Sequence, residues 1–167
     1  SSDLLEPGRV NLVMGPAEPI GQVFCTHPAT AIVSLTGSTA AGRKLMSLCS
    51  PQVKRLTLEL GGNAPLLVFE DADLDKAVAA LIANKFRAAG QTCVCANRIL
   101  VHRNNLDTFL EKLVPKVAAL RVGNGMDATT DIGPLIDRAA WDKVHEHVRD
   151  AIARGAQRVI GGQLPRP

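Results

Sequence analysis

The sequence predicts an α/β fold, because strand-like and helix-like segments alternate along the chain. Short apolar segments bounded by Gly or Pro are followed by longer ones whose apolar residues recur every three or four positions. The 167 residues are 46% hydrophobic and 21% charged, which excludes a disordered chain and a coiled coil. Only 3% are aromatic, so the core has to be built from Leu, Val, Ile and Ala.

The first part of the chain predicts strands on either side of one helix. The three expected strands are residues 11–14, 31–35 and 54–60. The helix follows the second strand and runs to about Cys49, with Ser38 or Thr39 as its N-cap. The pair Gly61-Gly62 ends the third strand and is the best candidate boundary in the chain.

The second part predicts longer amphipathic helices. Its three expected strands are residues 65–69, 98–102 and 158–160. One helix begins at Asp71 or Asp73 and closes at Gly90, and the next is capped by Asn105. We expect Pro115 to kink or split that helix, since an interior Pro costs about 3 kcal/mol.

A last helix carries an apolar stripe from Trp141 to Ile152 and closes at Gly155. The chain starts at Ser1 and stops in a Pro-rich segment directly after a predicted strand. We therefore expect a truncated part of a longer protein.

Composition excludes several kinds of function. The formal charge of +3 and the few aromatic residues argue against a nucleic-acid partner. No apolar run approaches the roughly 18 residues of a membrane span, and no signal peptide precedes the first strand, so we expect a cytoplasmic protein with no membrane partner. Four irregularly spaced cysteines fit neither a disulfide framework nor a metal site.

A Gly-rich turn from strand to helix is the first candidate site. It spans residues 37–42, with Gly37, Ser38 and Gly42 as its main members. The N–H groups and positive end of such a helix can bind a phosphate. The spacing is neither G-x-G-x-x-G nor a P-loop, so a plain capped helix is an open alternative.

Glu59 is the second candidate, as a general base. It stands between two leucines at a strand end, and partial burial would suit a carboxylate to that role. Strand residues alternate between faces, so the competing interpretation is an ordinary outward-facing side chain.

Cys93 is the third candidate, as a nucleophile. It follows a break at Gly90 and could begin a new helical turn, whose N-terminus would favour the thiolate. The alternative is a small buried apolar residue. Cys95 could pair with Cys93 across one residue, and so strained a ring favours a redox switch over a structural bridge.

Together these segments resemble the aldehyde dehydrogenase superfamily. Residues 34–39 (SLTGST), 58–62 (LELGG) and 90–93 (GQTC) occur in the order of that superfamily and at about its spacing. Residues 85–98, 121–125 and 132–136 resemble its succinate-semialdehyde dehydrogenase branch. The resemblance implies a partial fold of that kind: the second half of a Rossmann-type cofactor domain in residues 1–60 and the start of the α/β catalytic domain in residues 61–167.

The resemblance also implies site roles. It makes Cys93 the nucleophile that forms a thiohemiacetal and then a thioester, and Glu59 the base that activates the hydrolytic water. It places NAD or NADP against Gly37, Ser38 and Gly42, with further contacts at Gly15 and Leu60.

The resemblance implies further that Arg87 binds the distal carboxylate of succinate semialdehyde, although Arg87 could instead be a favourable cation at a helix C-terminus. It makes Cys93 and Cys95 an oxidative switch. It places the side-chain oxyanion donor and the group that holds the cofactor ribose outside these residues.

We expect the full-length protein to oxidise a small-molecule aldehyde, to form a homo-oligomer and to need no metal. The isolated chain should be inactive. Two alternatives stay open, a nucleotide-binding module without catalysis and a thiol redox protein built on Cys93 and Cys95. A longer reading frame with the missing groups would favour the enzyme, and the absence of a C-x-x-C motif counts against the redox protein.

Overall fold

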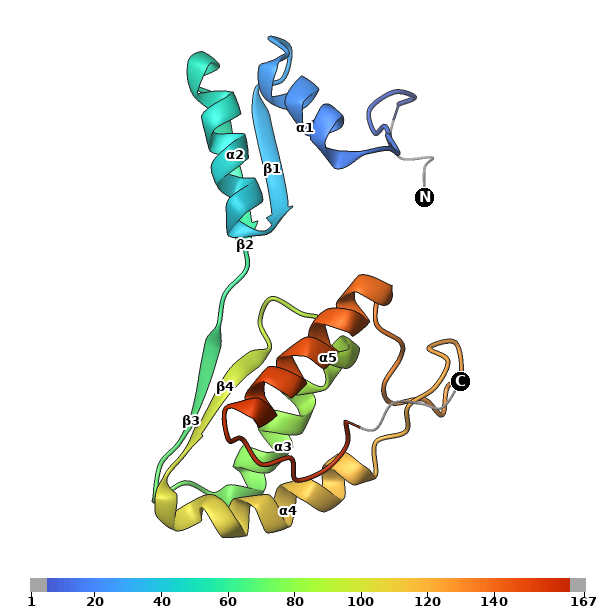
Figure 1. Ribbon diagram of the computed structural model, residues 1–167. Coiled ribbons are helices and arrows are strands. Elements are labelled where there is room, and N and C mark those ends of the chain that lie inside the picture. The colour runs from blue at the N-terminus through green and yellow to red at the C-terminus, as the bar shows by residue number, and fades with distance from the viewer. Residues whose placement is uncertain (1–5, 163–167) are drawn as a thin grey trace. The chain divides into compact units, whose positions relative to one another are not determined.

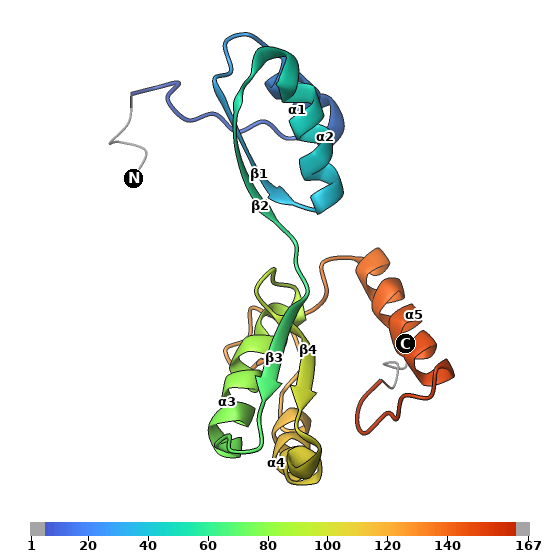
Figure 2. The same ribbon diagram turned by 90° about the vertical axis from the view of Figure 1, so that its left-hand side faces the viewer.

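The computed structural model describes residues 6–162, which divide into two compact units. The division lies between Gly61 and Gly62. Each unit contains two parallel strands joined by a helix, the arrangement that parallel pairing requires (Figures 1 and 2). In the described part of the chain, no helix is both long and apolar enough to cross a bilayer.

The first unit is built on strands β1 (Ile32–Gly37) and β2 (Arg55–Leu60). Its helices are α1 (Ala17–Thr26) and α2 (Thr39–Cys49), which contact each other. The core centres on Val33 and two cysteines, Cys25 and Cys49. Ser38 caps α2, since its Oγ accepts a hydrogen bond of 3.1 Å from Ala41 N, as predicted.

The second unit is built on strands β3 (Ala64–Val68) and β4 (Ala96–Val101). Its helices are α3 (Leu74–Lys85), α4 (Leu106–Ala118) and α5 (Arg138–Ala153). Asp73 caps α3, and Val68, Val78, Leu81 and Phe109 form the core between the strands, α3 and α4. These elements confirm the predicted strand–helix–strand order.

Two predicted strands are wrong. Residues 11–14 are exposed and irregular, and the helix after them, α1, was not predicted. Residues 158–160 are also irregular and exposed. A strand exists only where a neighbouring strand completes its hydrogen bonds, and neither segment pairs with one among the described residues.

The predicted split of α4 at Pro115 is wrong, because the helix runs as one piece through Pro115 to Ala118. Pro115 lies in the last turn, where both it and Glu111 are exposed, so water can bind the carbonyl that loses its helical donor. Asn105 stands at the N-cap position but makes no capping bond with its side chain. Its amide donates instead to the carbonyls of Phe69 and Glu70, at 2.9 and 3.0 Å.

Candidate functional site

The predicted site residues lie in both units, and each unit is described by itself. The first unit holds the Gly-rich turn and Glu59, and the second holds Arg87, Cys93 and Cys95.

The Gly-rich turn joins β1 to α2. The first N–H groups of α2 lack intrahelical acceptors by helix geometry, and Ser38, Thr39 and Ala40 are exposed. The Ser38 hydroxyl accepts the capping bond and keeps its own proton available for a ligand. This turn can therefore bind an anionic phosphate group.

Gly42 has a packing role that the sequence pattern did not show. It is buried, and a Cβ on it would lie 2.9 Å from Leu60 Cδ2. The absent side chain thus lets α2 lie close against β2. The exposed Gly15 precedes α1, outside any strand.

Glu59 lies on the exposed face of β2. Leu56, Leu58 and Leu60 alternate with it on the half-buried face, and Thr36 is its neighbour on β1. The expected partial burial is therefore wrong, and the outward-facing interpretation describes this strand. An exposed carboxylate can still take a proton from a water molecule that approaches it.

Cys93 lies in a turn and not at the start of a helix. The turn spans residues 92–95 and is closed by a hydrogen bond of 3.3 Å from Cys95 N to Thr92 O. No helix begins there, so the predicted effect of a helix N-terminus on the thiol is wrong. Cys93 is nonetheless the one exposed cysteine of the four.

The other three thiols are buried and free. Burial, followed by a hydrogen bond with Cys49, raises the pKa of the Cys25 thiol to about 11. Cys95 Sγ donates to Asn84 O at 3.2 Å. Exposure therefore singles out Cys93 as the thiol that a small substrate can reach.

Arg87 begins the 3₁₀ turn Arg87–Gly90, two residues beyond the end of α3. Its placement in the last turn of that helix is therefore wrong. Its side chain is exposed, and it takes part in none of the ion pairs found within residues 6–162. A guanidinium in this state is available to bind a carboxylate.

The backbone before Cys93 is strained. Ala88, Ala89 and Gly90 all have positive φ, of 49°, 56° and 76°. Only Gly adopts this region without cost, and strain of this kind gathers at functional sites. Sequence reasoning missed this feature, because two alanines carry no signal for a left-handed conformation.

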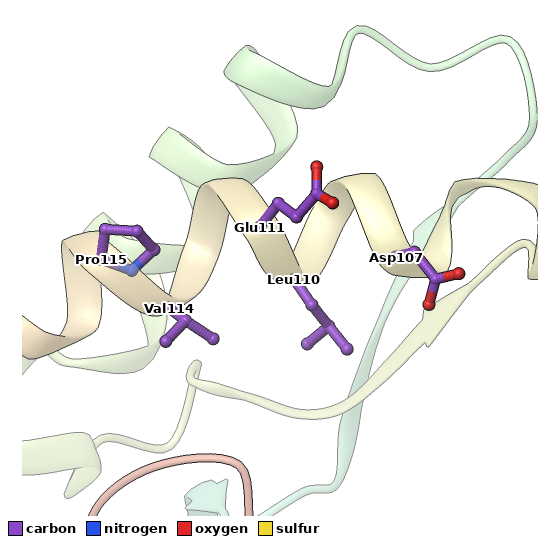
Figure 3. Close-up of a pocket in the computed structure, with 5 residues that line it drawn as sticks. All are labelled: Asp107, Leu110, Glu111, Val114 and Pro115. Carbon is purple, nitrogen blue, oxygen red and sulfur yellow. The ribbon is translucent and has the colours of Figure 1, made fainter.

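Several hollows lie in the second unit. One, of about 810 Å³, borders the cysteine loop through Lys85, Phe86, Gly90 and Gln91. Another is an open depression on α4 that holds no predicted site residue. Figure 3 shows its lining, which is Asp107, Leu110, Glu111, Val114 and Pro115. Among the described residues, no group of three or more His, Cys, Asp or Glu could hold a metal ion.

Comparison with known proteins finds semialdehyde dehydrogenases among the relatives of this chain. The chain is 51% identical over 156 residues to a succinate-semialdehyde dehydrogenase [NADP(+)] of Escherichia coli (strain K12), covering 93% of this chain and 32% of that protein. It is 49% identical to a glutarate-semialdehyde dehydrogenase of Pseudomonas putida, covering 94% of this chain and 33% of that protein.

A solved structure agrees with these relatives. The crystal structure of succinate-semialdehyde dehydrogenase from Burkholderia pseudomallei superposes with a TM-score of 0.88 at 50% identity, covering 90% of this chain and 31% of that one. The chain thus spans about a third of the length of the proteins it matches. Residues 3–167 match the aldehyde dehydrogenase family. The chain belongs to the aldehyde dehydrogenase family.

Proposed function

We propose that this chain carries the nucleophile and the general base of an NAD(P)-dependent dehydrogenase that oxidises a semialdehyde, with succinate semialdehyde as its first candidate. The observation that carries the proposal is the exposed thiol of Cys93, in a strained loop of a chain that belongs to this family. The semialdehydes named for the relatives indicate the substrate class.

The proposed chemistry begins at Cys93. Its thiolate adds to the aldehyde carbon, and the Cys93 backbone N–H donates to the oxyanion that forms. A bound nicotinamide cofactor supplies the hydride acceptor for the oxidation to a thioester. Glu59 then takes a proton from water as that water attacks the thioester, and the carboxylic acid leaves as Cys93 recovers its thiol.

The first unit supplies a fitting cofactor cradle in this proposal. The N-terminal turn of α2 would hold the pyrophosphate of NAD or NADP, with the Ser38 hydroxyl as a donor. Gly42 would act indirectly, by setting the distance between α2 and β2. Gly37, Gly15 and Leu60 complete the proposed cofactor contacts.

The proposal extends to the setting of the full-length protein. It would be a homo-oligomer in the cytoplasm, where free cysteines such as these remain reduced. The residues assigned to the first unit would complete a cofactor domain, and those of the second would begin a catalytic domain.

The test uses a chimera in which residues 3–167 replace the matching third of the Escherichia coli relative. The chimera should reduce NADP with succinate semialdehyde, and Cys93→Ser should abolish this. Glu59→Gln should produce a burst of NADPH followed by slow turnover, because only thioester hydrolysis needs the base. Normal steady turnover without a burst would show that Glu59 is not the general base. Activity in Cys93→Ser would show that Cys93 is not the nucleophile.

A further inference from the structure

One residue of α3, Asn84, holds the loop that carries Cys93. Its Nδ2 donates to Val94 O at 3.2 Å, and its Oδ1 accepts from Ala96 N at 2.6 Å. Its backbone carbonyl also accepts from Cys95 Sγ at 3.2 Å. Three successive residues after Cys93 are thus bonded to one position on a regular helix.

The chemistry of the amide suits this clamp. A carbonyl oxygen needs a donor and a backbone N–H needs an acceptor, and a short amide side chain offers both at once. The opposite orientation of the amide would place donor against donor and acceptor against acceptor. Both hydrogen bonds therefore require the same orientation of the Asn84 side-chain amide.

The loop also bonds within itself, since Thr92 Oγ1 lies 2.6 Å from Cys95 Sγ and Cys95 N donates to Thr92 O at 3.3 Å. Residues 87–90 are not regular helix, since Ala88 and Ala89 have positive φ. On the N-terminal side of Cys93, Gln91 Oε1 accepts from Ile136 N at 2.9 Å. Cys93 itself is exposed, so packing does not fix it. Its position depends on the bonds made by its neighbours.

We propose that Asn84 is a positioning residue that holds Val94, Cys95 and Ala96 against the end of α3, and thereby sets the place of the Cys93 thiol and keeps Cys95 protected. The catalytic consequence rests on the proposed function, whereas the clamp itself does not. A misplacement of a reacting group by about 1 Å can cost about 100-fold in rate, so such a clamp matters for a nucleophile.

The first experiment measures the clamp in the 167-residue chain. Each cysteine is alkylated with iodoacetamide, and its labelling rate is followed by peptide mass spectrometry. Asn84→Ala should raise the rate at Cys95 about 5–30-fold, because the turn opens more often once two hydrogen bonds are lost. The rates at Cys25 and Cys49 should stay unchanged, which shows that the first unit remains folded.

Asn104→Ala is the matched control. Asn104 also donates through its amide, to Glu70 Oε1 at 2.7 Å, but it makes none of the loop bonds. Its removal should leave Cys95 protected. An unchanged Cys95 rate in Asn84→Ala, or an equal rise in both variants, would overturn the clamp.

The second experiment measures turnover in the chimera. Asn84→Ala should lower kcat for succinate semialdehyde and for butanal alike by up to about 100-fold, with little change in KM. A kcat within twofold of the unmutated chimera would refute the positioning role. If the unmutated chimera fails to oxidise aldehydes while Asn84→Ala still exposes Cys95, the proposed function is wrong and the clamp stands.

Discussion

At the scale of single residues, exposure separates the two thiols of the 93–95 pair. Cys93 is exposed, whereas Cys95 is buried with its Sγ bonded to Asn84 O. The buried, small-residue interpretation therefore describes Cys95 in its reduced state. A disulfide between the two cysteines requires Cys95 to break its hydrogen bond to Asn84 O. The oxidative switch therefore remains a prediction.

The oxidative switch predicts reversible loss of activity. Mild peroxide should inactivate the chimera, and dithiothreitol should restore it, because a ring closed over one residue is strained and easily reduced. Peroxide should still inactivate the Cys95→Ala variant, but dithiothreitol should restore less of its activity than it restores in the unmutated chimera. If reversible inactivation is the same in Cys95→Ala, the Cys93–Cys95 bridge is not its cause.

Arg87 predicts substrate selectivity at the same scale. Its guanidinium is exposed and free of ion pairs within residues 6–162, so it can pair with the distal carboxylate of a semialdehyde. Arg87→Ala in the chimera should raise KM for succinate semialdehyde by roughly 10–150-fold, the equivalent of about 1.5–3 kcal/mol. The value of kcat/KM for butanal should barely change, and equal losses for both aldehydes would return Arg87 to a structural role.

At the scale of elements, close packing of one element on another and a local ion pair hold the backbone in place. The packing of α2 on β2 depends on the missing side chain of Gly42. The segment between α4 and α5 depends on Arg121 and Asp131. Their side chains bond at 2.9 and 3.1 Å, and the backbone N–H groups of residues 131 and 132 both donate to Arg121 O. We call this set of bonds the Arg121–Asp131 bracket.

Gly42→Ala should destabilise the chain. The new Cβ would meet both Cδ atoms of Leu60, at 2.9 and 3.2 Å, and overpacking costs about 1–3 kcal/mol against a helix-propensity gain of about 1 kcal/mol. We expect a net loss of up to about 2 kcal/mol in the free energy of unfolding by urea. Adding Leu60→Ala should relieve the clash, so the double variant should lose less than the sum of the two single losses.

Gly21→Ala supplies the control, since nothing lies within 4 Å of a Cβ at that position in α1. It should stabilise the chain by about 0.5–1 kcal/mol. A gain of similar size at Gly42 would show that the approach to Leu60 is not tight.

The Arg121–Asp131 bracket predicts a pH dependence. Hydrogen bonds from the Arg121 side chain and backbone lower the pKa of Asp131 from 3.8 to about 2. Because the folded value lies below the unfolded one, the stabilisation is present above about pH 4 and is lost as the pH falls toward about 2. Amide protection of residues 121–132, corrected for intrinsic exchange, should fall over that range.

Asp131→Asn should show low protection of residues 121–132 already at neutral pH, with little further loss in acid. Asp150→Asn, which removes an exposed ion pair with Arg154 in α5, should leave this segment unchanged. Protection that is insensitive to pH in the unmutated chain would mean that the ion pair does not hold the segment.

At the scale of the whole molecule, the chain spans about a third of its relatives and divides into two units. The resemblance to the family predicts that the side-chain oxyanion donor and the group that holds the cofactor ribose lie outside these residues. Loss of one oxyanion donor alone costs about 100–1,000-fold in rate. The isolated 167-residue chain should therefore produce no measurable NAD(P)H from any aldehyde, and production that Cys93→Ser abolishes would contradict this.

Several features of the fold could be predicted from local sequence. The strand–helix–strand order of both units, the Ser38 and Asp73 caps and the Gly61 boundary all follow from patterns within a few residues of each feature. The motifs around Glu59 and Cys93 likewise identified the family, which the comparisons confirmed. Such signals are readable because caps, turns and apolar periodicity depend on near neighbours.

Other features were decided only by the tertiary structure, because they depend on residues far apart in the chain. The sequence by itself determined the fold class, the family and the residues to test. It also predicted strands at 11–14 and 158–160, for which residues 6–162 offer no partner strand to complete their bonds. It could not show that Glu59 is exposed, that Gly42 meets Leu60 or that Asn84 holds the loop of Cys93. Burial, close approach and hydrogen bonds across the fold arise only when distant segments pack together, and local patterns carry little record of them.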